Sequence, residues 1–200
     1  MRVAALLLAG GESRRMGTPK QLLDWDGEPL VRAQARALIE AGCDPVVVAL
    51  GHRAREIAPA LAGLPVVVVR NEDYRSGRAT SVRAASAALP PGLDAVVVLN
   101  VDQPRSAAAI AAVIGRHRAK PSAVTRPTVG GRGGHPVVFA GRLAAELAAV
   151  SEADEGLRAV VRAHSDQEDR WETGDPAYLV DLNTPADVTA ARPGRRRESP

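Results

Sequence analysis

The chain has 200 residues, of which 46% are hydrophobic and only 2% aromatic, and its formal net charge is +3. This length fits a single domain with a core built mainly from Ala, Val and Leu. The lack of a basic face with interleaved aromatic residues argues against nucleic-acid binding. No apolar run approaches the ~20 residues that cross a bilayer, so no membrane association is expected. The single Cys43 excludes an internal disulfide and fits a reducing, cytoplasmic location.

Short apolar runs alternate with helical patterns along the chain, which predicts stacked βαβ units. Strands are expected at 3–8, 45–50, 66–70, 95–101, 123–126, 136–140 and 178–182. Helices are expected at 30–41, 54–61, 81–89, 106–118, 142–150, 157–164 and 185–191. The valine runs in strands 45–50 and 66–70 are typical of strands buried on both faces. We therefore predict a three-layer α/β/α domain over 1–191, with a mostly parallel, mixed sheet of about seven strands, and a disordered basic tail over 192–200.

The first expected strand runs directly into a glycine-rich, basic loop. Gly10 and Gly11 are followed by Arg14, Arg15 and Lys20. Glycine lets backbone N–H groups approach phosphate oxygens closely, and Arg and Lys add charge and hydrogen-bond donors. The spacing fits neither G-x-x-x-x-G-K-[ST] nor G-x-G-x-x-G. The loop therefore predicts a phosphate site with Arg15 and Lys20 as its cations, whereas Arg14 is equally consistent with a solvated surface residue.

Two polar segments follow later expected strands. Because ligands of open α/β sheets gather at the carboxyl ends of the strands, Asp102, Asp181 and Asn183 should meet the glycine loop in one crevice. Mg²⁺ prefers oxygen ligands and is commonly held by one or two carboxylates together with substrate phosphates. Asp102 is therefore a predicted metal ligand, because Ser106 is better placed to cap the following helix. Asp181 is the second candidate ligand, with Asn183 as its alternative.

Two further segments carry candidate contacts. Ser81, with Gly77 and Thr80, is expected to cap the helix at 82–89. A stretch with four glycines in five residues precedes His135 and is typical of a mobile lid or binding edge. His135 is either a substrate contact or a hydrogen-bonded residue at a strand edge. No second His or Cys stands at the spacing of a zinc site.

The chain resembles a known family in five segments that occur in the family's order and extend to about Ala191. The first is Leu8-Ala9-Gly10-Gly11-x-Ser13-x-Arg15-Met16-Gly17-x-x-Lys20, and the others are 71–77 with 80–82, 101–104, 134–136 and 181–187. They resemble segments of the Rossmann-like, sugar-nucleotide-type nucleotidyltransferases. The narrower resemblance is to the molybdopterin nucleotidyltransferases, which comprise the molybdenum cofactor cytidylyltransferases and their guanylyl relatives.

This resemblance implies a reaction and a set of site residues. A nucleoside triphosphate would give its nucleoside monophosphate to the terminal phosphate of molybdopterin, with Mg²⁺ as cofactor and pyrophosphate as product. The implied nucleotide-binding residues are Leu8, Ala9, Gly10, Gly11, Ser13, Arg15, Lys20, Gly77 and Ser81. Arg15, Lys20 and the metal-binding Asp102 would act in catalysis, and His135 would lie near the pterin acceptor. A molybdenum hydroxylase of the xanthine dehydrogenase type would receive the product.

Several alternatives stay open at this point. Asp102-Gln103-Pro104 and the Gly-His-Pro segment favour the cytidylyl branch and CTP, whereas Ala9-Gly10-Gly11 is nearer the guanylyl branch. The acceptor could instead be a sugar phosphate or phospholactate. A non-catalytic chaperone that binds nucleotide and hands on the cofactor would keep the glycine loop but could dispense with Asp102.

Overall fold

The computed structural model describes residues 1–13 and 16–191. Arg14, Arg15 and the tail 192–200 lie outside the described residues, so the roles predicted for them stay predictions. Within the described part, no helix combines the length and the apolar composition that a bilayer crossing requires.

The core of the molecule is a mixed sheet of eight strands in the order β10-β7-β9-β6-β1-β4-β5, with the short β8 paired to β7. Its strands are β1 (Val3–Ala9), β4 (Val46–Leu50), β5 (Val66–Arg70), β6 (Ala95–Asn100), β7 (Val124–Val129), β8 (Arg132–Gly133), β9 (Val137–Ala140) and β10 (Glu168–Glu172). β1 is central and pairs in parallel with both β4 and β6, whereas β9 is antiparallel to β6 and β7. The carboxyl ends of β1, β4 and β6 therefore meet at one edge of the sheet.

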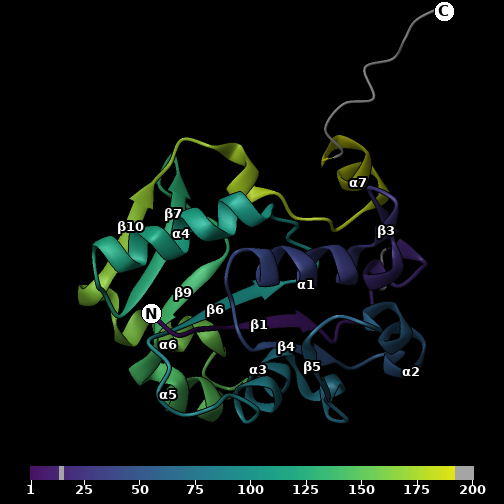
Figure 1. Cartoon of the computed structure of the whole chain (residues 1–200), viewed down its shortest axis with the longest axis horizontal. Helices are drawn as coiled ribbons and strands as arrows, with labels where there is room; N and C mark the ends of the chain where they lie inside the picture. Colours follow the sequence, from purple (N-terminus) through teal and green to yellow (C-terminus); the bar gives the residue numbers. More distant parts are fainter. Residues whose placement is uncertain (14–15, 192–200) are drawn as a thin grey trace, which may run out of the picture.

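Helices cover both faces of this sheet (Figure 1). They are α1 (Leu30–Glu40), α2 (Ala54–Ile57), α3 (Arg78–Ser86), α4 (Ala107–Ala119), α5 (Ala144–Ala149), α6 (Leu157–Ala163) and α7 (Pro185–Ala191). Alternate residues of β1 serve different cores: Ala5 and Leu7 pack with side chains of α1 and α4, and Leu6 packs with those of α3, α5 and α6. This alternation follows from the two-residue period of a strand. The predicted three-layer α/β/α fold with a mostly parallel, mixed sheet is confirmed.

The expectation that the valine run at 66–70 is buried on both faces was wrong. β5 forms the last strand of the sheet, and within the described residues it pairs only with β4. Val67 and Val68 are each 42% exposed, in contrast to the fully buried strand β4. A continuous valine run predicts the strand correctly, but it does not distinguish an edge position from a central one.

The segment expected as a strand at 178–182 was also predicted wrongly. It contains a 3₁₀ helix, Pro176–Leu179, followed by irregular backbone. Asp175 caps this 3₁₀ helix by accepting a hydrogen bond from Ala177 N at 2.9 Å. The carbonyl groups of Tyr178 and Val180 accept hydrogen bonds from a buried arginine, so they do not need a neighbouring strand.

Four further features differ from the prediction. The strand β10 was missed because its sequence is charged, and a small hairpin of β2 (Asp24–Trp25) and β3 (Glu28–Pro29) was missed although Asp-Gly between the strands is a hairpin signal. α3 begins before Ser81, so Ser81 does not cap it. The glycine-rich segment after β7 forms a turn into β8, held by Glu172, which accepts hydrogen bonds from Gly130 N at 2.8 Å and Gly131 N at 3.3 Å.

Candidate functional site

A cavity of about 500 Å³ opens where the carboxyl ends of β1 and β6 meet. The strand register pairs Leu8 with Asn100, so the loops that leave these two strands start side by side. Of the residues predicted for the site, Leu8, Gly10, Gly11, Ser13, Lys20, Ser81 and Asp102 line this cavity. The topology thus brings together segments that lie far apart in the sequence, as the strand-end rule predicts.

The cavity contains a lysine bound by oxygen atoms from two segments. Lys20, at the start of the 3₁₀ helix Lys20–Leu22, places its Nζ 3.1 Å from Asp102 Oδ2 and 3.2 Å from Asn183 Oδ1. Asp102 follows β6, and Asn183 lies just before α7. Two oxygen atoms held by different parts of the fold therefore converge on a single cation at the floor of the cavity.

Asn183, rather than Asp181, lies beside Asp102. Asn183 lines the cavity, whereas Asp181 is exposed and does not line it. Among the described residues, no group of three or more His, Cys, Asp or Glu is arranged to hold a metal ion. A divalent cation here would therefore depend on one carboxylate, one amide oxygen and oxygen atoms of the substrate. This donor set fits Mg²⁺, which is usually held by few protein ligands.

The glycine loop is held in place by Gln21, a residue that sequence reasoning missed. Gln21 is 1% exposed, and its Nε2 donates to the carbonyl oxygens of Ala9 at 2.7 Å and Gly11 at 3.1 Å. Lys20 N donates to Ser13 Oγ at 3.1 Å and closes the other side of the loop. No sequence pattern marks a glutamine for this role, because the contact depends on how the loop folds back over the strand end.

The first glycine of the loop packs tightly against α3. A Cβ at Gly10 would lie only 2.7 Å from Ser81 Oγ. Ser81 Oγ is itself fixed because it accepts a hydrogen bond from the buried Asn71 Nδ2 at 3.0 Å. The close approach explains why the position is glycine, and it places the helix side chain directly at the wall of the cavity.

Gly77 and Arg78 form the entrance to α3, and they differ in their relation to the cavity. Arg78, at the end of the polar loop 71–78, lines it, whereas Gly77 does not. Gly77 has φ of 116°, and a Cβ there would lie 2.3 Å from the carboxyl carbon of Glu152. Glu152 accepts a hydrogen bond from Ala79 N at 2.9 Å. Gly77 therefore makes room for this remote helix cap.

His135 does not line the cavity. Burial, followed by the positive charge of Arg105, lowers the pKa of His135 to about 4. The imidazole is therefore neutral at physiological pH. A contact between His135 and an acceptor stays a prediction, and it would be a hydrogen bond from an uncharged ring rather than an ion pair with phosphate.

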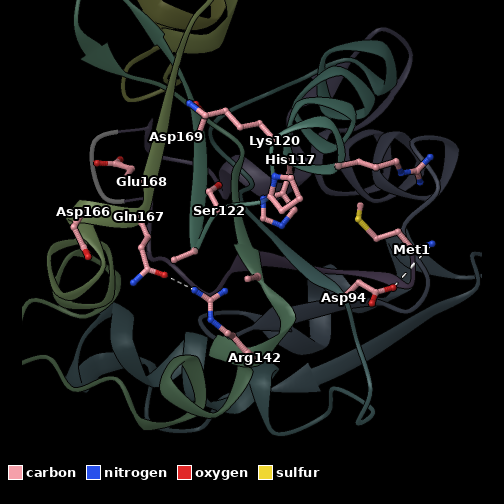
Figure 2. Close-up of a pocket in the computed structure, with 14 residues that line it drawn as sticks. Met1, Asp94, His117, Lys120, Ser122, Arg142, Asp166, Gln167, Glu168 and Asp169 are labelled. Atoms are coloured by element: carbon pink, nitrogen blue, oxygen red, sulfur yellow. Dashed lines mark hydrogen bonds and ion pairs between the residues drawn. The ribbon is translucent and has the colours of Figure 1, made fainter.

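A larger cavity, of about 780 Å³, lies at the amino ends of the strands (Figure 2). Met1, two residues before β1, and Asp94, directly before β6, line it. Its most buried carboxylate, Asp169, accepts hydrogen bonds from Arg116 at 2.6 Å and Lys120 at 2.8 Å. None of the described residues predicted for the site lines this cavity.

Comparison with known proteins identifies the family. Residues 5–168 match the family model described as the MobA-like NTP transferase domain. The chain belongs to this family. It is a nucleotidyltransferase of the MobA-like type, which confirms the resemblance at the level of the family.

Two similar proteins are named for different activities, one as an oxidoreductase and one as a guanylyltransferase. The chain is 32% identical over 190 residues to the nicotine blue oxidoreductase of Paenarthrobacter nicotinovorans, covering 91% of this chain and 92% of that protein. It is 40% identical over 108 residues to a probable molybdenum cofactor guanylyltransferase of Opitutus terrae, covering 54% of this chain and 51% of that protein.

A solved structure extends the comparison to three dimensions. Rv0371c from Mycobacterium tuberculosis superposes with a TM-score of 0.81 and 27% identity, covering 95% of this chain and 97% of that chain. The manganese complex of Rv0371c superposes with a TM-score of 0.74 and 25% identity, covering 96% of this chain and 98% of that chain. The MobA-like chain therefore shares the fold of Rv0371c over nearly its full length.

Proposed function

We propose that the chain transfers a nucleoside monophosphate, with CMP favoured, from a nucleoside triphosphate to the terminal phosphate of a molybdopterin-type acceptor, and that the reaction requires Mg²⁺. The observation that carries this proposal is the convergence of Asp102 Oδ2 and Asn183 Oδ1 on Lys20 beside the glycine loop. The guanylyltransferase relative supports nucleotidyl transfer in the molybdenum cofactor pathway, and the manganese complex of Rv0371c supports a divalent metal.

The proposed chemistry is positioning and charge neutralisation. An oxygen of the acceptor phosphate attacks the α-phosphorus, a P–O bond forms, and the bond to the β-phosphate oxygen breaks to release pyrophosphate. The attacking phosphate is already an anion, so no strong general base is required. Mg²⁺, held by Asp102 and Asn183, would supply positive charge to the phosphates. Lys20 would exchange its contact with Asp102 for phosphate oxygens, and Arg15 would add a second cation.

The backbone of the glycine loop supplies the nucleotide side of the proposed site. Gln21 fixes this loop through the carbonyl oxygens of Ala9 and Gly11 and does not itself occupy the loop N–H groups, which would face phosphate in the proposed site. The rigid contact between Gly10 and Ser81 shapes the wall near the base. The Asp102-Gln103-Pro104 segment supports CTP, and the glycine pair supports GTP as the alternative. We place the reaction in the cytoplasm, with a molybdenum hydroxylase as recipient of the product.

An oxidoreductase activity is the second candidate. The relative from Paenarthrobacter nicotinovorans, which this chain matches over 92% of that protein's length, is named an oxidoreductase. In that case a reduced nicotinamide dinucleotide would bind with its phosphates on the glycine loop. It would transfer a hydride to an oxidised organic acceptor, which would also take up a proton. Such a site has no need for the paired oxygens of Asp102 and Asn183.

The test is a pyrophosphate-release assay on the full chain with Mg²⁺, molybdopterin and each nucleoside triphosphate in turn. The proposal predicts release that is greatest with CTP and is abolished by chelation of the metal. If release is greatest with GTP, the proposed nucleotidyl transfer would stand, but the preferred nucleotide would be GTP instead of CTP. No release with any triphosphate, together with oxidation of a reduced nicotinamide dinucleotide by an organic acceptor, would favour the second candidate. Tight nucleotide binding with neither reaction would favour a non-catalytic chaperone.

A further inference from the structure

A buried arginine directly follows the Asp102-Gln103-Pro104 segment. Arg105 is 3% exposed, and burial is the main cause that lowers its pKa to about 10. Burying a guanidinium is costly unless its donors are satisfied. The side chain does not line the nucleotide cavity, so its position calls for another explanation.

The guanidinium of Arg105 is satisfied by backbone carbonyl groups. Nε donates to His135 O at 2.8 Å, and Nη1 donates to Pro104 O at 2.8 Å and to Val180 O at 3.0 Å. Nη2 donates to Tyr178 O at 2.5 Å. The planar, forked donor set of arginine allows one side chain to bind all four acceptors.

These four carbonyls belong to three irregular segments, and each segment carries a candidate site residue. The segment with Pro104 carries Asp102, the next carries His135, and the segment with Tyr178 and Val180 leads to Asn183. Irregular buried backbone lacks the hydrogen bonds that a sheet would supply, so it must find other partners. Arg105 supplies those partners to all three segments at once.

Two direct backbone bonds join the same segments. Leu182 N donates to Asp102 O at 2.7 Å, and His135 N donates to Tyr178 O at 3.1 Å. The backbone N–H of Arg105 donates to Gln34 Oε1 of α1 at 2.8 Å, which fixes the whole assembly to a regular helix. The relative position of the three segments therefore depends on the Arg105 side chain and its anchor together with these two backbone hydrogen bonds.

We propose that Arg105 is a positioning residue, which holds the three segments together so that Asn183 stays beside Asp102 and the His135 segment stays bound to the Tyr178 segment. This inference rests on the proposed nucleotidyl transfer for its kinetic consequence, but the clamp itself is a property of the fold. Loss of the forked donor set should loosen 134–136 and 178–183. It should leave the glycine loop intact, because the hydrogen bonds of Gln21 and of Ser13 with Lys20 hold that loop independently.

The test variant is Arg105→Lys, which keeps the positive charge but offers its donors from a single nitrogen. The matched control is Arg116→Lys in α4, the helix that follows Arg105. Arg116 pairs with Asp169 at the opposite end of the sheet. In Arg105→Lys, hydrogen exchange at the amides of His135 and Leu182 should accelerate by about tenfold or more. The KM for the acceptor should rise by about tenfold, while the Kd for nucleotide without metal stays within about twofold.

Unchanged exchange at both amides in Arg105→Lys, or equal acceleration in Arg116→Lys, would overturn the proposal. If Arg105→Lys does not fold, Gln34→Leu is measured in the same way, because it removes the acceptor for the Arg105 backbone N–H. Unchanged exchange at His135 and Leu182 in that variant would then overturn the clamp. Absence of pyrophosphate release from the wild-type chain would refute the proposed reaction, and the exchange result would still decide the clamp.

Discussion

The two ends of the sheet carry cavities of different kinds. The amino-end cavity is the larger, at about 780 Å³ against about 500 Å³ at the carboxyl end. Its buried Asp169 is already neutralised by Arg116 and Lys120. At the carboxyl end, a glycine loop and oxygen atoms from two segments converge on Lys20. Convergence of groups at strand ends, rather than the size of a cavity, therefore identifies the candidate site.

The difference has a topological cause. β1, β4 and β6 run in parallel, so their carboxyl ends release three loops at the same edge. Unlike the strands, those loops do not have to hydrogen-bond to one another through their backbones, so they can present glycines, Asp102 and Lys20 to a ligand. The charged groups that close the amino end pair with each other across α4 and β10, and they contribute to stability.

Replacing Asp102 tests the functional end, and it should have the largest effect. Asp102→Asn keeps the shape and an oxygen for Lys20, but it removes the negative charge that would bind Mg²⁺. Pyrophosphate release should fall by about 10²- to 10⁴-fold, with little change in the midpoint of thermal unfolding. Turnover within about twofold of the wild type would remove Asp102 from the proposed mechanism.

Replacing Asp169 tests the opposite end. Asp169→Asn breaks the ion pairs of a carboxylate that is 3% exposed, which should lower the free energy of unfolding by about 3 kcal/mol in a urea titration. The loss is placed at the lower end of the range for buried pairs because the side chain of Lys120 is 62% exposed. Activity per folded molecule should be unchanged. If Asp169→Asn loses turnover per folded molecule as well as stability, the amino end of the sheet would also contribute to function, which would contradict the proposed difference between the two ends.

Acid titration should separate His135 from His117. The pKa of His135 is lowered from 6.5 to about 4 in the folded chain, so the unfolded state binds the proton first. The contribution of His135 is therefore present above pH 6.5 and is lost as the pH falls toward about 4, by about 3 kcal/mol. His135→Gln should flatten the stability curve over this window.

His117→Gln is the control for this titration, because burial also lowers the pKa of His117 at the amino-end cavity. His117→Gln should remove a different part of the decrease in unfolding free energy that occurs at acid pH. Identical curves for wild type and His135→Gln would show that His135 is not held neutral by the fold.

Adding a methyl group to the glycine loop should have the smallest effect on stability. Gly10→Ala places a Cβ against Ser81 Oγ, so the free energy of unfolding should fall by about 1 kcal/mol. The Gly10→Ala/Ser81→Ala double variant relieves the contact and should recover most of that loss in a double-mutant cycle. Additive effects would mean that the two positions do not touch in solution.

The sequence predicted the layers and the strand ends, because these follow from local apolar runs and short connections. It placed Lys20 and Asp102 correctly at one crevice, since both leave predicted strands. It did not predict Gln21 as the support of the glycine loop, or the neutral state of His135, because both depend on tertiary burial. The irregular path through Tyr178 and Val180 could not be predicted either, because a remote arginine satisfies its carbonyls.

Calorimetric titration of CTP and of GTP, with and without Mg²⁺, tests the central claim most directly. Nucleotide should bind about tenfold or more tightly with Mg²⁺ than without it, and this gain should disappear in Asp102→Asn and in Asn183→Leu. Asp181→Asn is the matched control and should keep the gain, because Asp181 does not line the cavity. A nucleotide affinity that is the same with and without Mg²⁺, or a Mg²⁺-dependent gain in affinity that is unchanged in Asp102→Asn, would contradict a metal-assisted triphosphate site at the carboxyl end of the sheet.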